Sequence, residues 1–214
     1  MDAKDVVPTR LEAAKSVALD YLGLRPQDRV GVVVFSEDAL TLLPPTRDLA
    51  LVKRQISDLK TDILPKEGTA LGTAIVAGIV RLEDSRAGTG MMVAMSDGGG
   101  NVGYGEPSSL AAAAAARGMV VHAVAFGRPG EGSDFDAPTM ERIARAGKGV
   151  YVPAGEPEAA RIIAAAAADL AHTRKEFSQN VPVDEYPRFL AGAMVCLFLA
   201  GALRFFGIYN LLSE

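Results

Sequence analysis

The chain has 214 residues, of which 49% are hydrophobic and 22% charged, enough to bury one sizeable core and carry one appendage. Its 22 basic and 26 acidic residues give a net charge of -4 without long single-sign runs, which excludes a basic nucleic-acid-binding face. The single cysteine, Cys196, excludes an internal disulfide framework and an all-cysteine metal site. No apolar run follows a basic region near Met1, so we expect no cleavable signal peptide.

Hydrophobic periodicity and capping signals divide most of the chain into alternating elements. The predicted helices, in chain order, run from Thr9 to Gly23, Thr46 to Lys60, Thr69 to Leu82, Ser108 to Arg117, Asp136 to Ala146 and Glu156 to about Glu176. The predicted strands are Val30 to Phe35, Ala39 to Leu43, Met91 to Met95, Val120 to Phe126 and Val150 to Val152. We interpret the alanine runs at 111–116 and 164–168 as packed helix faces and not as linkers.

The alternation from residue 69 onward indicates an α/β fold, with a doubly wound, mostly parallel sheet and helices on both faces. Val30 to Phe35 is almost continuously β-branched, which predicts a strand buried on both faces. Ala39 to Leu43 should pair back on it as an edge strand that Pro44 and Pro45 end. The α/β domain is therefore expected to cover residues 1–176.

The segment from residue 189 to 212 differs in kind from the rest. Only Arg204 interrupts these 24 residues with a charge. As one helix they would extend about 36 Å, enough to cross a hydrocarbon core of about 30 Å. We therefore predict a linker over 177–187 and one transmembrane helix over 188–212 that anchors the protein in the cell membrane, with the side on which the domain lies left open. A buried core helix is the alternative.

Two loops at the predicted carboxyl ends of strands carry candidate binding residues, since ligands of doubly wound sheets bind at this edge. Thr69 lies at the start of a helix, where its hydroxyl sits beside unpaired backbone N–H groups. An ordinary helix cap is the alternative for Thr69. Asp97 directly follows a buried strand and precedes glycines that let the backbone approach a ligand. A turn-forming role is the alternative for Asp97.

Taken together, these loops resemble the von Willebrand factor A (VWA) family. The metal-ion-dependent adhesion site of that family combines D-x-S-x-S after the first strand, a Thr at the start of a later helix and an Asp after the fourth strand. Thr69 and Asp97 match the last two, so the resemblance makes them candidate metal ligands. It also includes R-L-E-A-A-K at 10–15 and E-G-T-A-L-G at 67–72. The order of these motifs is most similar to the bacterial aerotolerance-operon branch, in which a membrane helix follows the domain.

The chain departs from the family pattern at its start. In the family the D-x-S-x-S loop commonly ends S-G-S-M and leads into R-L-E-A-A-K, so Met1 aligns with that internal Met. The resemblance then implies that the first, central strand and three metal-site residues are missing. The strands at 30–35 and 91–95 would be left about 9.6 Å apart with unpaired backbone groups. There are three alternatives. The true start lies further upstream, a partner supplies the strand, or the sheet closes up without this strand.

The resemblance implies a binding function, in which a bound Mg²⁺, Mn²⁺ or Ca²⁺ captures a carboxylate of a partner protein. With Thr69 and Asp97 alone, water would fill most of about six ligand positions, so metal binding by this chain should be weak or absent. We therefore expect no enzyme, but a membrane-anchored protein–protein interaction or scaffold module. Its implied partners are MoxR-type AAA+ ATPases and sister VWA proteins, in stress tolerance or the maturation of complexes.

Two enzymatic interpretations compete with this one. Gly98 to Gly103 satisfies G-x-G-x-x-G after a strand, and Arg128 follows the next strand, as in an NADP-linked oxidoreductase. However, the next helix should open at the third glycine and is predicted about five residues later. Asp97 could instead be the nucleophile of a hydrolase. Of the two histidines, His122 lies inside an apolar strand as a core residue and His172 on a helix, so neither suggests a catalytic partner.

Overall fold

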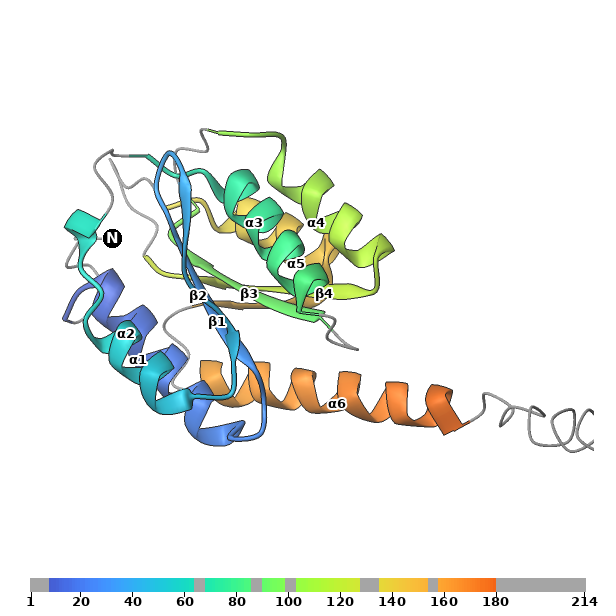
Figure 1. Cartoon of the computed structure of the whole chain (residues 1–214). Helices are drawn as coiled ribbons and strands as arrows, with labels where there is room; N and C mark the ends of the chain where they lie inside the picture. Colours follow the sequence, from blue (N-terminus) through green and yellow to red (C-terminus); the bar gives the residue numbers. More distant parts are fainter. Residues whose placement is uncertain are drawn as a thin grey trace, which may run out of the picture. The chain divides into compact units, whose positions relative to one another are not determined.

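The computed structural model describes residues 8–63, 68–85, 90–98, 103–127, 135–153 and 158–179. The chain divides into two compact units, Met1–Thr173 and Arg174–Glu214, and both candidate residues lie in the first. In chain order the elements are α1 (Arg10–Leu24), β1 (Val30–Phe35), β2 (Ala39–Thr46), α2 (Leu49–Ser57), a 3-10 turn (Thr61–Ile63), α3 (Leu71–Asp84), β3 (Gly90–Ser96), α4 (Pro107–Ala116), β4 (Met119–Ala125), α5 (Ala137–Ala146), β5 (Lys148–Pro153) and α6 (Ala159–Gln179) (Figure 1).

The five strands of the described residues form two separate sheets. β3, β4 and β5 pair in parallel in the order β3-β4-β5, with Met92 opposite Val121. β1 and β2 form an antiparallel hairpin in which Phe35 lies opposite Ala39. The α/β fold with a parallel sheet is confirmed, but β1 and β2 make a sheet of their own. Because no ladder joins β1 to β3 in this part of the chain, the sheet has not closed up across the expected gap.

Helices cover both faces of the three-stranded sheet. On one face β4 shares a core with α3, α4 and α5, whose buried residues are Leu71, Ile75, Ile79, Ala111, Ala114, Met119, Val121, Ala123, Ala125, Met140, Ile143 and Ala144. On the other face a second core joins α1 and α6, with buried residues Ala14, Val124, Phe126, Val152, Ala159 and Ile163. β4 is buried along its whole length, as expected of a central parallel strand.

α1 and α3 each contribute to the packing of both sheets. α1 places Ala14 in the second core, which Met91 of β3 joins, and Leu22 in a third core with Val30 of β1. α3 belongs to the first core, to which Phe35 of β1 and residues of β3 are added. The side chains of β1 and β3 are nevertheless mostly half-buried, although both sequences are apolar. Among the described residues, β1 and β3 therefore pack on the same helices without being paired to each other.

Local side-chain signals set several helix ends as predicted. Thr9 Oγ1 accepts the N–H of Glu12 at 3.1 Å at the start of α1. Asp136 Oδ1 accepts the N–H of Thr139 at 3.0 Å at the start of α5. Each bond satisfies a backbone donor that has no partner inside the helix. Ala111 of the first alanine run is fully buried, which confirms that this run is a packed helix face.

β2 continues through the two prolines that were expected to end it. The strand runs to Thr46 and so includes Pro44 and Pro45. The pairing shifts register near Gly31 of β1, where a Cβ atom would lie 3.0 Å from the Leu43 carbonyl oxygen. Prolines are tolerated in an edge strand with such an irregularity because no ladder N–H is required of them.

The predicted transmembrane helix over residues 188–212 needs correction. That segment, Cys196 within it and residues 180–187 of the predicted linker lie outside the described residues. Among the helices that are described, none is long and apolar enough to cross a membrane. The longest of them, α6, has 21 residues but carries Arg161, Asp169 and Lys175, and such charges are costly in hydrocarbon. The described fold therefore contains no membrane-spanning helix.

Candidate functional site

Asp97 lies where the sequence predicts, directly after β3 at the carboxyl edge of the parallel sheet. Its side chain is 14% exposed and forms an ion pair with Arg10, whose Nη1 lies 3.1 Å from Asp97 Oδ2. Arg10 is the first residue of α1, and its side chain is 6% exposed. The Asp97 carboxylate is thus neutralised by a buried cation from 87 positions earlier in the chain.

Close contacts hold the backbone on either side of Asp97. The Asp97 carbonyl oxygen accepts the N–H of Asp136 at 2.9 Å, and the N–H of Gly98 donates to Ser96 Oγ at 3.1 Å. Gly98 has φ +77, and a Cβ atom there would lie 2.3 Å from the Asp136 carbonyl oxygen. Glycine alone meets both the backbone conformation and the lack of space. The turn after β3 is therefore fixed against the residue that caps α5.

Gly127, two residues beyond the end of β4, leaves room for the Arg10 side chain. It has φ +152, and a Cβ atom there would lie 3.2 Å from Arg10 Cζ and 2.6 Å from Phe135 Cδ2. The guanidinium is therefore held near the carboxyl ends of two neighbouring strands, with Asp97 after β3 and Gly127 after β4. Sequence reasoning missed Arg10. The one available signal was a cation in the first turn of a helix, where the helix dipole disfavours it.

Thr69 precedes α3 but does not cap it. α3 starts at Leu71, and its N-cap is Ala70, without a capping bond from a side chain. The N–H of Ala70 donates to the carbonyl oxygen of Ser36 at 2.5 Å, which attaches this loop to the end of β1. The interpretation of Thr69 as an ordinary helix cap is therefore wrong, and Thr69, a half-buried residue, remains a candidate ligand. Asp97 forms an ion pair with Arg10.

Residues 103–105 pack on the first turn of α3 and expose an aromatic side chain there. The N–H of Tyr104 donates to Thr73 Oγ1 at 3.1 Å, and a Cβ atom on Gly72 would lie 2.2 Å from the Tyr104 carbonyl oxygen. Gly103, with φ +115, lies against Ala70, the residue that follows Thr69. The Tyr104 side chain itself is 72% exposed. This edge of the molecule therefore presents a large aromatic group next to the Thr69 loop.

Residues 1–100 match the family model described as von Willebrand factor type A domain. A UPF0353 protein of Mycolicibacterium paratuberculosis (strain ATCC BAA-968 / K-10) is 31% identical over 153 residues, which cover 65% of this chain and 45% of that protein. The chain therefore spans less than half the length of this curated relative.

Solved structures share the fold. The conserved hypothetical protein BatB from Bacteroides thetaiotaomicron is 27% identical with a TM-score of 0.72, over 80% of this chain and 93% of that chain. The described domain has the VWA fold. An aerotolerance-related membrane protein from Bacteroides fragilis NCTC 9343 gives a TM-score of 0.69 at 24% identity over the same shares of the two chains. These similarities support a VWA-type domain like that of BatB, while the missing first strand remains a prediction.

A metal occupies the adhesion site of another protein of this fold. Proximal thread matrix protein 1 from the mussel byssus has a zinc-occupied site of this kind. That protein is 15% identical to this chain, with a TM-score of 0.56 over 72% of this chain and 40% of that chain. In the part of the present chain that the structure describes, no group of three or more His, Cys, Asp or Glu side chains could hold a metal ion. Thr69 and Asp97 supply two oxygen ligands where Mg²⁺ takes about six, and Arg10 already pairs with Asp97. The described residues alone do not fit the metal site.

Glu106 disfavours the NADP-linked interpretation. α4 starts at Pro107, and its N-cap is Glu106, whose Oε2 accepts from Ser108 Oγ at 2.5 Å and from the N–H of Ser109 at 2.7 Å. These bonds lower the pKa of Glu106 to about 2, and the bond from Ser108 has the largest effect. An ionised carboxylate therefore holds the helix N-terminus at which a pyrophosphate would have to bind. Arg128, the proposed 2′-phosphate ligand, lies outside the described residues.

His122 is a core residue, as the sequence predicts. It is 2% exposed within β4, and its Nδ1 accepts the N–H of Val150 at 3.0 Å. Burial lowers the pKa of His122 below its usual 6.5. Asp97 is paired with Arg10, which cannot act as a general base at neutral pH. The side chain of His172 lies outside the described residues, so neither histidine supports the hydrolase interpretation.

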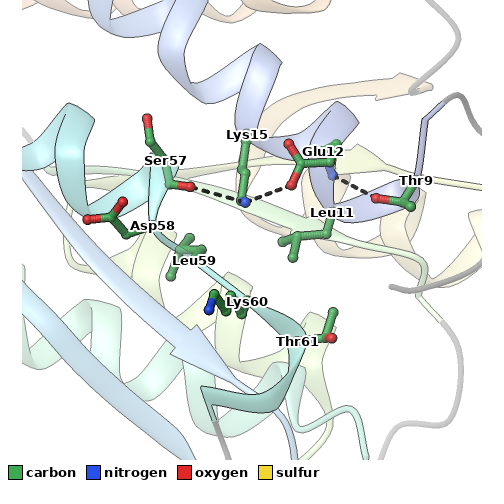
Figure 2. Close-up of a pocket in the computed structure, with 9 residues that line it drawn as sticks. All are labelled: Thr9, Leu11, Glu12, Lys15, Ser57, Asp58, Leu59, Lys60 and Thr61. Carbon is green, nitrogen blue, oxygen red and sulfur yellow. Dashed lines mark hydrogen bonds and ion pairs between the residues drawn. The ribbon is translucent and has the colours of Figure 1, made fainter.

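A surface groove of about 710 Å³ lies between the start of α1 and the residues that follow α2 (Figure 2). Lys15 Nζ reaches across it and donates to Glu12 Oε1 at 2.7 Å and to the carbonyl oxygen of Ser57 at 3.2 Å. Ser57 ends α2, where a cation is favoured by the helix dipole. Lys15 therefore links α1 to α2, and neither Thr69 nor Asp97 lines this groove.

Proposed function

We propose that this chain is a VWA-type protein–protein interaction module that captures a partner at the carboxyl edge of its strands. The observation that carries the proposal is the surface next to the Thr69 loop, where Tyr104 is 72% exposed on a segment packed closely against α3. Tyrosines on rigid supports are frequent anchors of protein interfaces because they bury a large area at low entropic cost. The proposed module is an interaction or scaffold component and not an enzyme.

The proposed partner presents a carboxylate to this edge. A MoxR-type AAA+ ATPase and sister VWA proteins are the candidates, in stress tolerance or the maturation of complexes. The similarity to BatB, at 27% identity over most of both chains, supports this choice of branch. In the complete site Mg²⁺, Mn²⁺ or Ca²⁺ would be held by Thr69 and Asp97 together with ligands from outside the described residues. For the 214-residue chain the proposal is that metal binding is weak.

The proposal includes a further strand between β1 and β3. Its source in this proposal is a segment that the structure does not describe or a partner protein. Two observations support it. Among the described residues, β1 and β3 each pair on one side only, and both apolar strands are mostly half-buried while β4 is fully buried. A strand placed there would satisfy the backbone groups of both edges and join the two sheets into one.

The test is binding of the purified chain to the purified MoxR-type ATPase and sister VWA protein of the same organism, measured by biolayer interferometry. Tyr104→Ala should weaken binding at least about tenfold, the loss of one interface anchor worth about 1.4 kcal/mol. Thr69→Ala should weaken it as well. Leu24→Ala is the matched control, because Leu24 is also exposed but lies at the last residue of α1. Binding that Tyr104→Ala and Leu24→Ala leave equally strong would contradict the proposal.

A further inference from the structure

The groove between the start of α1 and the segment after α2 combines apolar and cationic side chains (Figure 2). Its volume of about 710 Å³ falls in the range of about 300–1,000 Å³ that is typical of ligand sites. We propose that this groove binds an acidic segment of a partner protein, with an apolar side chain between Leu11 and Leu59 and a carboxylate at Lys15 and Lys60. The inference goes beyond the proposed function, because it gives the domain a second contact surface.

Hydrogen bonds and packing fix both walls of the groove. On one side the Thr9 hydroxyl accepts the N–H of Glu12 at 3.1 Å at the start of α1. On the other side the N–H of Leu59 donates to the carbonyl oxygen of Ile56 at 3.3 Å, and Ile56 is buried in the core that joins α1 to α2. A site whose walls are already in place loses little conformational freedom when it binds a ligand.

Lys15 holds an ammonium group between the two walls. Its side chain is 10% exposed, and Nζ donates to Glu12 Oε1 at 2.7 Å and to the carbonyl oxygen of Ser57 at 3.2 Å. An ammonium has three N–H donors, and described residues accept two of them. The third is available to a ligand in the groove. A carboxylate suits this position, because hydrogen bonds between charged groups are stronger than neutral ones.

The other charges of the groove also favour an anion. Two carboxylates line it and each has a cation, since Lys15 pairs with Glu12 and Arg54 Nε lies 3.8 Å from Asp58 Oδ2. Lys60 lines the groove as well and is exposed, and it has no ion-pair partner among the described residues. The groove therefore presents an ammonium without a counter-charge, which attracts an acidic segment and repels a basic one.

Two leucines form the apolar part of the groove. Leu11 belongs to the first turn of α1 and Leu59 to the segment after α2, and both are half-buried (Figure 2). Protein interfaces usually combine an apolar part with polar and charged groups around it. An inorganic anion would use the ammonium groups alone. A peptide segment with an apolar side chain next to a carboxylate would use both parts, so we assign the groove to a partner protein.

The test is selection of random heptapeptides displayed on phage against the purified 214-residue chain, with counter-selection against Leu59→Arg, which fills the groove. The selected peptides should carry aspartate or glutamate next to leucine, isoleucine or phenylalanine. In fluorescence polarisation with a synthetic copy of one selected peptide, Lys60→Glu should weaken binding at least about fivefold, because an exposed ion pair is lost and a repulsion is added. Lys148→Glu is the matched control, since Lys148 is also exposed but begins β5 outside the groove.

Three results would overturn the proposal. They are a selection that enriches no peptide, enriched peptides without a carboxylate, and equal affinities for Lys60→Glu and Lys148→Glu. A chain that dimerises in size-exclusion chromatography and becomes monomeric as Lys60→Glu would assign the groove to a second copy and overturn the proposal too. Neither an ATPase nor a sister VWA protein enters these measurements. A failed partner-binding experiment at the Thr69 loop would therefore bear on the proposed function alone.

Discussion

His122 joins two strands at a point where the backbone ladder is irregular. The pairing of β4 with β5 shifts register between Val121 and Ala123, and Lys148 adopts φ 54, which non-glycine residues rarely take. At this point the His122 Nδ1 accepts the N–H of Val150. The ring proton is then on Nε2, which is buried without a hydrogen-bond partner among the described residues. The fold therefore requires the neutral imidazole.

The stability of the domain should consequently fall below pH 6.5. Burial lowers the pKa of His122 in the folded state, whereas the unfolded chain takes up the proton near 6.5. The stabilisation is therefore complete above pH 6.5 and is lost as the pH falls through the lowered pKa, by at most about 1.4 kcal/mol per pH unit. Urea unfolding at pH 7.5 and 5.5 measures it. The chain has 2 histidines, and each can be replaced separately. His172→Gln should keep the loss of stability at pH 5.5, whereas His122→Asn should remove it. Equal pH dependence in both variants would exclude His122 as the cause.

At the scale of single residues, the sequence predicted what depends on near neighbours. Thr9 and Asp136 cap helices because a short polar side chain can reach an N–H three residues on. Asp97 was placed correctly because a carboxylate after a buried strand falls at the sheet edge. Its pairing with Arg10 could not be predicted, since it joins residues 87 positions apart and depends on how α1 packs against β3.

At the scale of elements, the burial of a strand's side chains indicates whether the strand has a neighbour on both sides. Continuous apolar runs predict strands buried on both faces, and β4 meets that expectation fully. β1 and β3 have the same kind of sequence but remain mostly half-buried, because in the part of the chain that the structure describes each has a neighbouring strand on one side only. The register irregularity that accommodates Pro44 and Pro45 was not predictable either, because it depends on Gly31 of the opposite strand.

The unpaired edges of β1 and β3 should be visible in amide hydrogen exchange. In the 214-residue chain alternate amides of β3 should exchange at least about tenfold faster than those of β4, because they have no ladder partner among the strands that the structure describes. β4 is the internal control, since it pairs with strands on both sides. Uniform protection of β3 and β4 in the 214-residue chain would rule out an open edge.

At the scale of the molecule, helices and not a shared ladder connect the two sheets. α1 contributes Ala14 to the core under the three-stranded sheet and Leu22 to the core under the hairpin. α3 brings Phe35 of β1 together with the core of β3 and β4. The sequence predicted these helices and their apolar faces, but not that they would be the main link between two sheets. Cooperativity across the domain should therefore depend on side-chain packing of α1 and α3.

Two matched core truncations should separate the two parts of the domain. Leu22→Ala removes a fully buried side chain from the core of α1, α2 and β1, and Ile163→Ala removes one from the core of α1, α6 and the three-stranded sheet. Each should cost about 2–5 kcal/mol locally. Because no backbone ladder transmits the loss, Leu22→Ala should reduce hydrogen-exchange protection mainly in β1, β2 and α2 and leave β4 largely protected, whereas Ile163→Ala should expose β4 and β5. If both variants lose protection equally in both sheets, α1 and α3 couple the halves as tightly as a continuous sheet would.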